Sequence, residues 1–306
     1  MLLKICNNAI FESNKIEKVQ LPTVFSPYMK TLFNAYSTNF TDGQKTALNT
    51  FVDTVKSNST LASKIKKMYM PMLSSSLDDV RINVADYLNN DTITVDAFTG
   101  TWNSTNFTFA ENGGMYSTAS SLSTLYTSTG VAGMSNMKMN NWGLINVLNK
   151  GEGGTNGTRL TSTGGGCFFL RNWSNGNKAV QGAANGTTGK YCGQDISELY
   201  GVPAGYFQNK TTAPCIDMLM FSENQLLGLE GTASSVQTYD LKSDYTDTIN
   251  INMQDKCYFS TLIPTATNYT NYGTVNYMIL ITEALTADEM IALRDAIDTF
   301  VDYYFA

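Results

Sequence analysis

Apolar residues recur at helical spacing in the first quarter of the chain. The segment PYMKTLFNAY, residues 27–36, begins at a proline, and in the next segment, residues 41–58, Thr41 and Gln44 have the spacing of a capping box. An apolar stripe follows the helical period there: Ala47, Leu48, Phe51, Val52 and Val55. We therefore predict helices over 27–36 and 41–58.

Two further helices are predicted from the same kind of pattern. A shorter one runs from Thr60 to Lys67 and stops before Pro71. The other closes the chain in TADEMIALRDAIDTFVDYYFA, where Thr286 and Glu289 form a second capping box. One face of this helix is apolar: Met290, Leu293, Ile297, Phe300, Val301 and Tyr304.

Between these helices, from about Val80, the pattern changes to short runs of β-branched and aromatic residues separated by Gly, Asn and Ser clusters. The runs predicted as strands are 92–95, 106–109, 114–118, 135–140, 144–148, 159–163, 167–171, 178–181, 215–222, 226–229, 257–261 and 276–281. Many short strands without intervening helices predict a sandwich or jelly roll rather than a parallel α/β sheet.

The predicted fold class is mainly β, an antiparallel β-sandwich with a short N-terminal helical region and a C-terminal helix. Three parts are expected along the chain: an arm over 1–25, which ends near Pro22 and Pro27, a helical connector over 26–90, and the sandwich with its closing helix over 91–306.

The chain contains few charged residues for its length. Charged residues make up only 15% of the 306, against about 25% in an average soluble domain, so the polarity comes from Ser, Thr, Asn and Gly. Such composition is common in all-β fibre and adhesin proteins. The net charge of −6 leaves no excess of Lys and Arg for phosphates, so nucleic acid is not an expected partner.

The chain contains no histidine, which excludes a Ser-His-Asp triad, a Cys-His pair and a His-ligated metal. The five cysteines are widely spread without a Cys-x-x-Cys pair, and we interpret them as buried thiols. No cofactor and no metal are expected. The N-terminus lacks the apolar run of a signal peptide, and no stretch approaches a membrane span, so synthesis in a cytoplasm without membrane insertion is expected.

Three segments, in order, resemble one family. FTDGQKTALNTFVDTVKSNSTLASKIKKMYM is similar to the segment that precedes a lectin-like sandwich in many tailed-bacteriophage structural proteins. DAFTGTWNSTNFTFAENGGMYSTA resembles the passage from Gly-Thr-Trp to an Asn-Gly turn before the first sheet strand of those proteins. YMILITEALTADEMIALRDAIDTFVDYY resembles their closing strand and helix. Together the segments cover about a third of the chain.

The resemblance implies a concanavalin-A-like, laminin-G-like jelly roll in a non-enzymatic virion protein: a capsid (head) fibre or decoration protein, or a tail fibre subunit. It implies a virion location after synthesis in the bacterial host cytoplasm. The expected partners are other virion proteins, bound through the N-terminal region, and further copies of the chain. Host cell-surface polysaccharide is a further expected ligand. The alternatives are a polysaccharide-cleaving enzyme on the same sandwich fold and a non-viral lectin.

The tryptophans are the first candidates for sugar contact, because an aromatic face can stack on a saccharide. Trp102 and Trp142 are flanked by strand residues, which favours core packing. Trp173 follows a predicted strand in LRNWSNGNK. The candidate glycan-binding set is therefore Trp173 with Arg171, Asn172 and Asn175, with core packing of Trp173 as the alternative.

Carboxylate pairs are the second candidates. Asp217 and Glu223 flank one predicted strand, but six positions at about 3.3 Å each separate them by about 20 Å, too far for glycoside hydrolysis. A cleaving enzyme would need two acids from different strands within about 10 Å in an open groove. Asp244 and Asp247 mark the single loop considered for calcium, and Gly164–Gly166 is interpreted as a strand connector. No catalytic residue is assigned.

Overall fold

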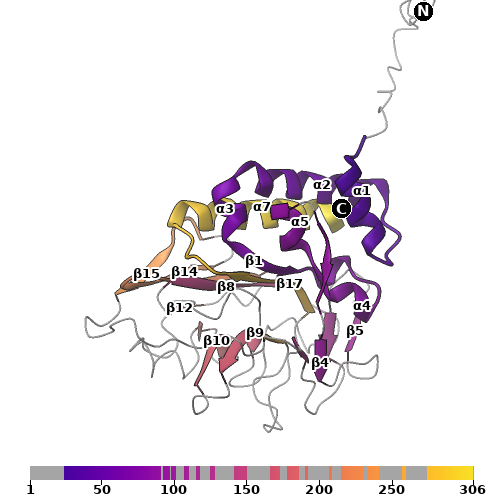
Figure 1. Ribbon diagram of the computed structural model, residues 1–306. Helices are drawn as coiled ribbons and strands as arrows, with labels where there is room; N and C mark the ends of the chain where they lie inside the picture. The colour runs from indigo at the N-terminus through magenta and orange to yellow at the C-terminus, as the bar shows by residue number, and fades with distance from the viewer. Residues whose placement is uncertain are drawn as a thin grey trace, which may run out of the picture.

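A computed structural model gives the fold in three layers: helices, a central sheet and an outer sheet (Figure 1). The structure describes residues 24–90, 92–96, 98–100, 107–109, 115–117, 125–127, 141–149, 166–172, 178–185, 190–191, 207–208, 215–230, 233–240, 257–259 and 274–305. The predicted arm over 1–25 and the predicted strands over 135–140 and 159–163 lie mostly or wholly outside these residues.

The N-terminal helices begin at polar caps. In α1, Pro27–Ala35, the Ser26 side chain accepts a hydrogen bond from the Met29 backbone N–H. In α2, Asp42–Ser57, the predicted Thr41–Gln44 capping box is present, and the predicted apolar stripe is buried. The two long helical predictions in this region are therefore confirmed, and both boundaries follow from local side-chain hydrogen bonds.

The third predicted helix is shorter than expected. The helix α3, Ser59–Lys64, ends where the strand β1, Ile65–Tyr69, begins. β1 pairs antiparallel with β17, Thr274–Ile281, with Met68 opposite Ile279. The prediction of helix to Lys67 is wrong because pairing with a strand near the other end of the chain overrides local helix propensity.

The chain next forms small elements beside β1, of which the sequence predicted the strand over 92–95 and not the others. They are the 3-10 helix η3, Pro71–Leu73, the helix α4, Leu77–Val80, the strand β2, Ile82–Asn83, the helix α5, Val84–Asn90, and the strand β3, Thr94–Val95. β2 and β3 pair with each other. The Asn83 side chain is fully buried, and its Oδ1 accepts hydrogen bonds from the Met68 and Ala85 backbone N–H groups, which ties α5 to β1.

Among the described residues, the central sheet has eight strands in the order β15-β14-β13-β8-β17-β6-β5, with β1 also paired to β17. The new members are β5 (Phe107–Phe109), β6 (Met115–Ser117), β8 (Asn141–Asn149), β13 (Cys215–Ser222), β14 (Gln225–Glu230) and β15 (Gln237–Asp240). Every pairing within it is antiparallel.

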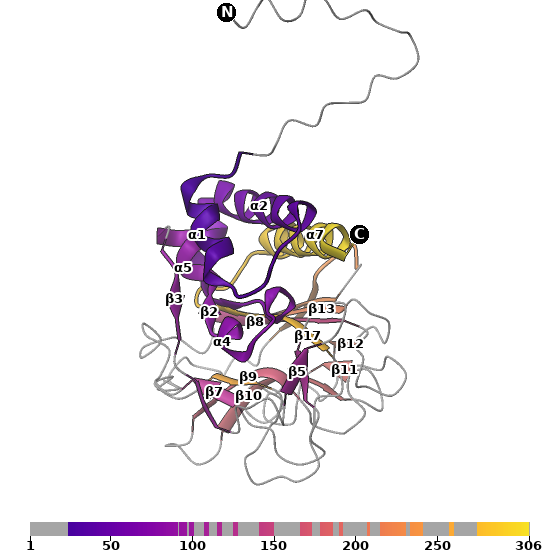
Figure 2. The same cartoon turned by 90° about the vertical axis from the view of Figure 1, so that its right-hand side faces the viewer.

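In the part of the chain that the structure describes, the outer sheet has seven strands in the order β12-β11-β10-β9-β16-β7-β4. They are β4 (Phe98–Gly100), β7 (Leu125–Thr127), β9 (Gly166–Asn172), β10 (Lys178–Asn185), β11 (Lys190–Tyr191), β12 (Phe207–Gln208) and β16 (Cys257–Phe259). β8 and β17 of the central sheet approach β9 and β10 of the outer sheet. Figures 1 and 2 both show the two sheets stacked on each other.

The closing helix α7, Ala287–Phe305, lies beside α2 above the central sheet (Figure 2). Its predicted apolar face is buried, and the rings of Phe51 and Phe300 lie 5.2 Å apart between the two helices. Helices from both ends of the chain therefore share one apolar core with the central sheet.

The observed architecture supports only the broader part of the predicted fold class. Antiparallel sheets, N-terminal helices and a C-terminal helix are all present. The description "mainly β" is not confirmed, because the helices form a complete layer that shares its core with the central sheet. The predicted boundary at 90 and 91 separates parts of the chain that pack together through β1.

Candidate functional site

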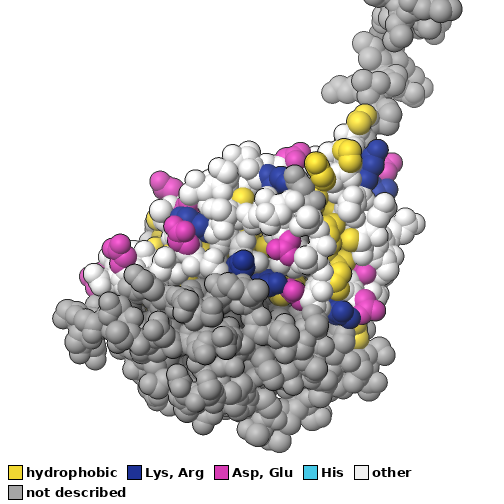
Figure 3. Space-filling model, viewed as in Figure 1, with side chains coloured by type: hydrophobic (Ala, Val, Ile, Leu, Met, Phe, Trp, Pro, Cys, Tyr) yellow, Lys and Arg dark blue, Asp and Glu magenta, His cyan; other side chains and the backbone are white. Residues whose placement is uncertain are grey.

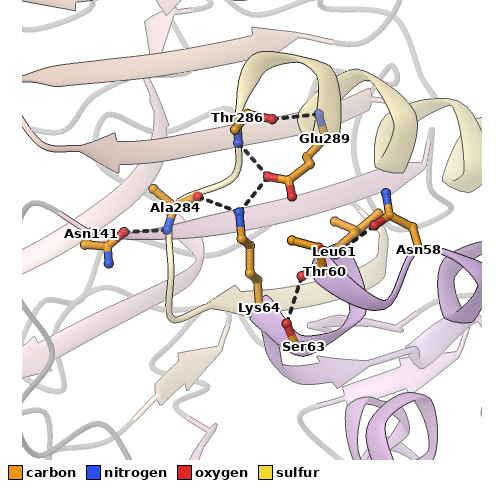
Figure 4. Close-up of polar contacts among 9 residues, drawn as sticks. All are labelled: Asn58, Thr60, Leu61, Ser63, Lys64, Asn141, Ala284, Thr286 and Glu289. Atoms are coloured by element: carbon orange, nitrogen blue, oxygen red, sulfur yellow. Dashed lines mark hydrogen bonds and ion pairs between the residues drawn. The ribbon is translucent and has the colours of Figure 1, made fainter.

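A buried lysine joins the helical layer to the start of α7 (Figure 4). Lys64 Nζ lies 2.7 Å from Glu289 Oε2 and donates a longer hydrogen bond, 3.4 Å, to the Ala284 carbonyl oxygen. Glu289 completes the predicted capping box by accepting from the Thr286 backbone N–H, while its own N–H donates to Thr286 Oγ1. Asn141 Oδ1 accepts from the Ala284 backbone N–H at 2.8 Å.

These contacts have an electrostatic consequence for Glu289. Burial raises the pKa of this carboxyl, but the hydrogen bond and positive charge of Lys64, with the Thr286 hydrogen bonds, outweigh burial and hold the pKa below its usual value. The interpretation of Glu289 as a capping residue is confirmed. Its buried partner Lys64 was not predicted. Lys64 and Glu289 pair with each other, and each also hydrogen-bonds to a backbone group, at Ala284 and Thr286. We therefore assign this cluster a structural role.

A second polar cluster surrounds Asp96 beside β1. Lys67 Nζ lies 2.7 Å from Asp96 Oδ2, and the Tyr69 hydroxyl donates to the same oxygen at 2.6 Å. Arg81 Nε donates to the Asp96 carbonyl oxygen, and the Asp96 N–H donates to the Arg81 carbonyl oxygen. Tyr69 is fully buried, so its phenol is not accessible to a substrate. This cluster holds the end of the β2–β3 pair against β1.

The central sheet is buried on the face that the helices cover. Residues opposite one another across four strands, Ile279, Ile145, Met218 and Leu229, form one row of this face. All four are at most 2% exposed and belong to the core shared with the helices. Alternate residues on each strand must then lie on the opposite face, toward the outer sheet.

That opposite face changes from apolar to polar along the strands. The row Trp142, Phe221 and Leu226 is fully buried, and the Trp142 and Phe221 rings stack with centroids 4.8 Å apart. The next row is also apolar: Leu280, Leu144, Leu219 and Gly228. The third row is Met278, Asn146, Asp217 and Glu230, which places an amide and two acids at neighbouring positions.

Asp217 therefore has a different acidic neighbour from the one considered in the sequence. Glu223 lies in the two-residue turn between β13 and β14, where it is exposed and has a φ of 47°. Glu230 on β14 is directly opposite Asp217 on β13. A two-residue turn at Glu223 and Asn224 implies this pairing, but Glu223 was interpreted as a strand-flanking residue and the hairpin was not predicted.

The predicted glycan-binding residues are only partly described. Arg171 and Asn172 occupy the end of β9, opposite Ala179 and Lys178 of β10. Trp173 and Asn175 lie outside the described residues, as do Trp102 and the loop with Asp244 and Asp247. Trp142 is buried, as predicted for a core residue.

Charged side chains of both signs are mixed on the described surface of the helical layer. Figure 3 shows Lys and Arg side chains interspersed with Asp and Glu over the helical layer, without a patch of one sign on the face drawn. Within the same residues, no group of three His, Cys, Asp or Glu side chains has an arrangement that could hold a metal ion. None of the described helices combines the length and apolar character of a membrane-spanning helix.

Comparison with known proteins gives similarity in structure alone. No family model and no curated sequence matches the chain. Domain 4 of AbnA, a GH43 extracellular arabinanase from Geobacillus stearothermophilus solved with arabinotriose, aligns with a TM-score of 0.45 and 10% identity over 76% of this chain and 98% of that one.

Two further similar structures are of larger proteins. Trypanosoma rangeli sialidase aligns with a TM-score of 0.44 and 12% identity over 83% of this chain and 39% of the sialidase. An arabinofuranosidase complexed with arabinofuranosyl-α-1,2-xylobiose aligns with a TM-score of 0.37 and 12% identity over 68% of this chain and 44% of that enzyme. The chain thus spans less than half the length of either enzyme.

These comparisons correct the expected function. The sequence predicts a non-enzymatic virion structural protein. The structures named above are instead of an arabinanase domain, a sialidase and an arabinofuranosidase, so the prediction of a non-enzymatic virion protein is not retained. Of the alternatives left open in the sequence, the polysaccharide-cleaving enzyme agrees better with them.

Proposed function

We propose that this chain is a carbohydrate-active protein that hydrolyses glycosidic bonds with Asp217 and Glu230 as its carboxylate pair. The observation that carries the proposal is the register of β13 and β14, which sets these two acids directly opposite each other. A cleaving enzyme on this fold is expected to need two acids from different strands within about 10 Å in an open groove, and the register supports the first of these two conditions.

The opposed register is compatible with the carboxyl separations of both hydrolytic mechanisms. Residues directly opposite on antiparallel strands have Cβ atoms about 4.5 to 5.5 Å apart. Retaining glycosidases separate their carboxyl groups by about 5 to 5.5 Å, whereas inverting enzymes need about 6.5 to 9.5 Å to admit a water. The anomeric configuration of the released sugar, followed by NMR, distinguishes the two mechanisms.

The chemistry requires the two acids to differ in protonation. In the retaining mechanism, one carboxylate attacks the anomeric carbon while the other, as an acid, protonates the leaving oxygen. The second group then takes a proton from the water that releases the sugar. Asn146, opposite Asp217 on β8, adds a neutral amide to the row.

Glycosidase assays on three variants test this function. Purified protein is incubated with arabinan, xylan, β-glucan, polygalacturonate and sialyllactose, and released sugar is measured. Asp217→Asn and Glu230→Gln should each reduce the rate by roughly 10²-fold or more. Glu223→Gln is the matched control, because this exposed acid lies in the adjoining turn and should leave the rate unchanged. Absence of hydrolysis by the unaltered protein, or equal rates in all variants, would contradict the proposal.

Glycan binding without cleavage is the second candidate function. It is favoured by Arg171 and Asn172 at the end of β9, since amide and guanidinium groups suit sugar hydroxyls. The contact of Trp173 and Asn175 with the same glycan, and the concanavalin-A-like jelly-roll topology, stay predictions of the sequence. Polysaccharide retention that Trp173→Ala abolishes, in a protein that releases no sugar, would favour this function over hydrolysis.

A further inference from the structure

The outer sheet carries aromatic residues side by side on three neighbouring strands. Phe169 of β9 lies opposite Tyr258 of β16, and Tyr258 lies opposite Tyr126 of β7. The same row continues to Gln181 on β10 at one end and to Thr99 on β4 at the other. Neighbouring strands lie about 4.8 Å apart, so the three aromatic positions span roughly 10 Å across the sheet.

The alternation of residues along each strand gives this sheet two faces of different composition. The rows next to the aromatic row belong to the opposite face, and both are strongly apolar: Gly182, Phe168, Phe259, Leu125 and Gly100 form one, and Val180, Leu170 and Cys257 form the other. Such a composition fits the interior between two stacked sheets. The face with the aromatic row is mixed instead, because Gln181, Thr99 and Arg171 share it.

The mixed face is therefore assigned to the side of the outer sheet that is turned away from the central sheet. β8 and β17 of the central sheet approach β9 and β10, and the helices lie beyond the central sheet (Figures 1 and 2). Neither view shows a described helix or strand on the far side of the outer sheet. Within the described part of the chain, no third layer covers the face of the aromatic row.

The residue types on this face suit a polysaccharide. An aromatic ring offers a flat apolar surface on which a sugar ring stacks, while the sugar hydroxyls need polar partners. Gln181 and Thr99 lie at the two ends of the aromatic row, and Arg171 lies two positions from Phe169 on the same face. Their amide, hydroxyl and guanidinium groups all hydrogen-bond hydroxyls. A sugar chain laid across the strands meets these residues on a flat sheet and requires no groove.

We propose that Phe169, Tyr258 and Tyr126 form a polysaccharide-binding platform on the outer face of the outer sheet, with Arg171 as a hydrogen-bonding residue. Of the two residues at the end of β9, Arg171 shares this face and Asn172 belongs to the opposite one. The platform is separate from the acid pair, which lies on the central sheet. It therefore holds a glycan whether or not the chain hydrolyses it, and this inference goes beyond the proposed hydrolysis.

Binding of soluble polysaccharides by the full chain tests the platform. Dissociation constants for arabinan, xylan, β-glucan and polygalacturonate are measured by affinity electrophoresis. For the polysaccharide that binds, Tyr126→Ala and Tyr258→Ala should each weaken binding by roughly tenfold, whereas Tyr258→Phe, which keeps the ring, should bind as the unaltered protein does. Tyr303→Ala is the matched control, because Tyr303 is 69% exposed on α7, in the helical layer.

Nitration of tyrosines by tetranitromethane tests the same surface in the unaltered protein, so this result does not depend on the folding of a variant. Tyr126 and Tyr258 should be nitrated in the free protein, and an excess of the bound polysaccharide should protect both. Tyr303 is the accessible reference, and Tyr69, which is fully buried, is the inaccessible one. Mass spectrometry of tryptic peptides reports the nitration of each tyrosine.

Failure of the platform is distinguishable from failure of hydrolysis. Weaker binding in the two alanine variants, with protection from nitration, supports the platform even in a protein that releases no sugar. Equal binding in every variant, no binding of any of the four polysaccharides, or nitration of Tyr126 and Tyr258 no faster than that of Tyr69 overturns it. A full-chain oligomer that becomes a monomer in Tyr258→Ala, measured by light scattering, also overturns it, because this face would then contact a second copy.

Discussion

Tyr36 and Tyr69 are both buried tyrosines, but their hydroxyl groups have different surroundings. The Tyr69 hydroxyl donates to Asp96 at 2.6 Å, whereas the Tyr36 hydroxyl is buried without a hydrogen-bond partner among the described residues. Burial, and then the negative charge of Asp79, raises the pKa of Tyr36 far above its ordinary value. The Tyr36 phenol therefore stays neutral and carries an uncompensated desolvation cost.

This difference predicts opposite effects of the same substitution. Tyr36→Phe should leave the free energy of unfolding unchanged or raise it by up to about 1 kcal/mol, because it removes an unpaired polar atom. Tyr69→Phe should lower it by about 2 kcal/mol, because Asp96 loses a hydrogen bond in a buried cluster. Urea denaturation measures both. A loss of stability in Tyr36→Phe equal to that in Tyr69→Phe would show that the Tyr36 hydroxyl is paired.

At the scale of elements, the approach of β8 to β13 depends on a glycine. A Cβ added at Gly143 would collide with the Met220 Sδ and lie 2.6 Å from the Leu219 carbonyl oxygen. Gly143→Ala should lower the free energy of unfolding by about 1 to 3 kcal/mol, because the strand backbone must shift. Gly43→Ala in α2 is the control: its nearest neighbour is 3.9 Å away, and alanine there should stabilise the helix. Thermal unfolding of the two variants measures the contrast.

The start of α7 should respond to acid through Glu289. The pKa of this carboxyl is lowered in the folded state, so its contribution to stability is present above the pKa of an unfolded glutamate and is lost as the pH falls through the folded value. In urea titrations between pH 7 and pH 3, the unaltered protein should lose more stability than Glu289→Gln. If the free energy of unfolding changed with pH equally in the two proteins, Lys64 would not stabilise the ionised carboxylate of Glu289.

Elements whose boundaries depend on local groups were predictable from the sequence. The helices α2 and α7 begin at capping boxes, and those boxes use side chains only three residues apart. β1 was not predictable in the same way, because its residues form a strand by pairing with β17 and not through their own local propensity. The pairing of Asp217 with Glu230 depends on the turn at Glu223, where a positive φ is unusual for glutamate, so residue type did not indicate the turn.

At the scale of the whole molecule, residues 24–90 are part of the core that supports the central sheet. Val52 and Phe51 of α2, Met68 of β1 and Leu293 of α7 are all at most 2% exposed and lie in one core. Deletion of residues 1–90 should therefore give an unfolded or aggregated protein. Deletion of residues 1–23 is the matched control, because it keeps every residue of this core, and the shortened protein is expected to fold.

Circular dichroism and light scattering on the two truncated proteins check this prediction. A folded protein lacking residues 1–90 would show that the sandwich is independent of the helical layer. Light scattering on the full chain also tests the homo-oligomer that the sequence predicts. Any shortened variant used in that test must retain residues 24–90, because they are part of the core.

The ion pair of Lys64 and Glu289 joins residues 225 positions apart, and β1 pairs only with β17 among the described strands. During synthesis, the N-terminal helices leave the ribosome long before their partner strand and α7 exist. Their apolar faces stay exposed to solvent until the end of the chain has been synthesised. This delay slows folding and favours aggregation in the meantime. A ribosome that stalls before β17 would release a chain with no stable core, so quality control in the cell would act on truncated products of this gene.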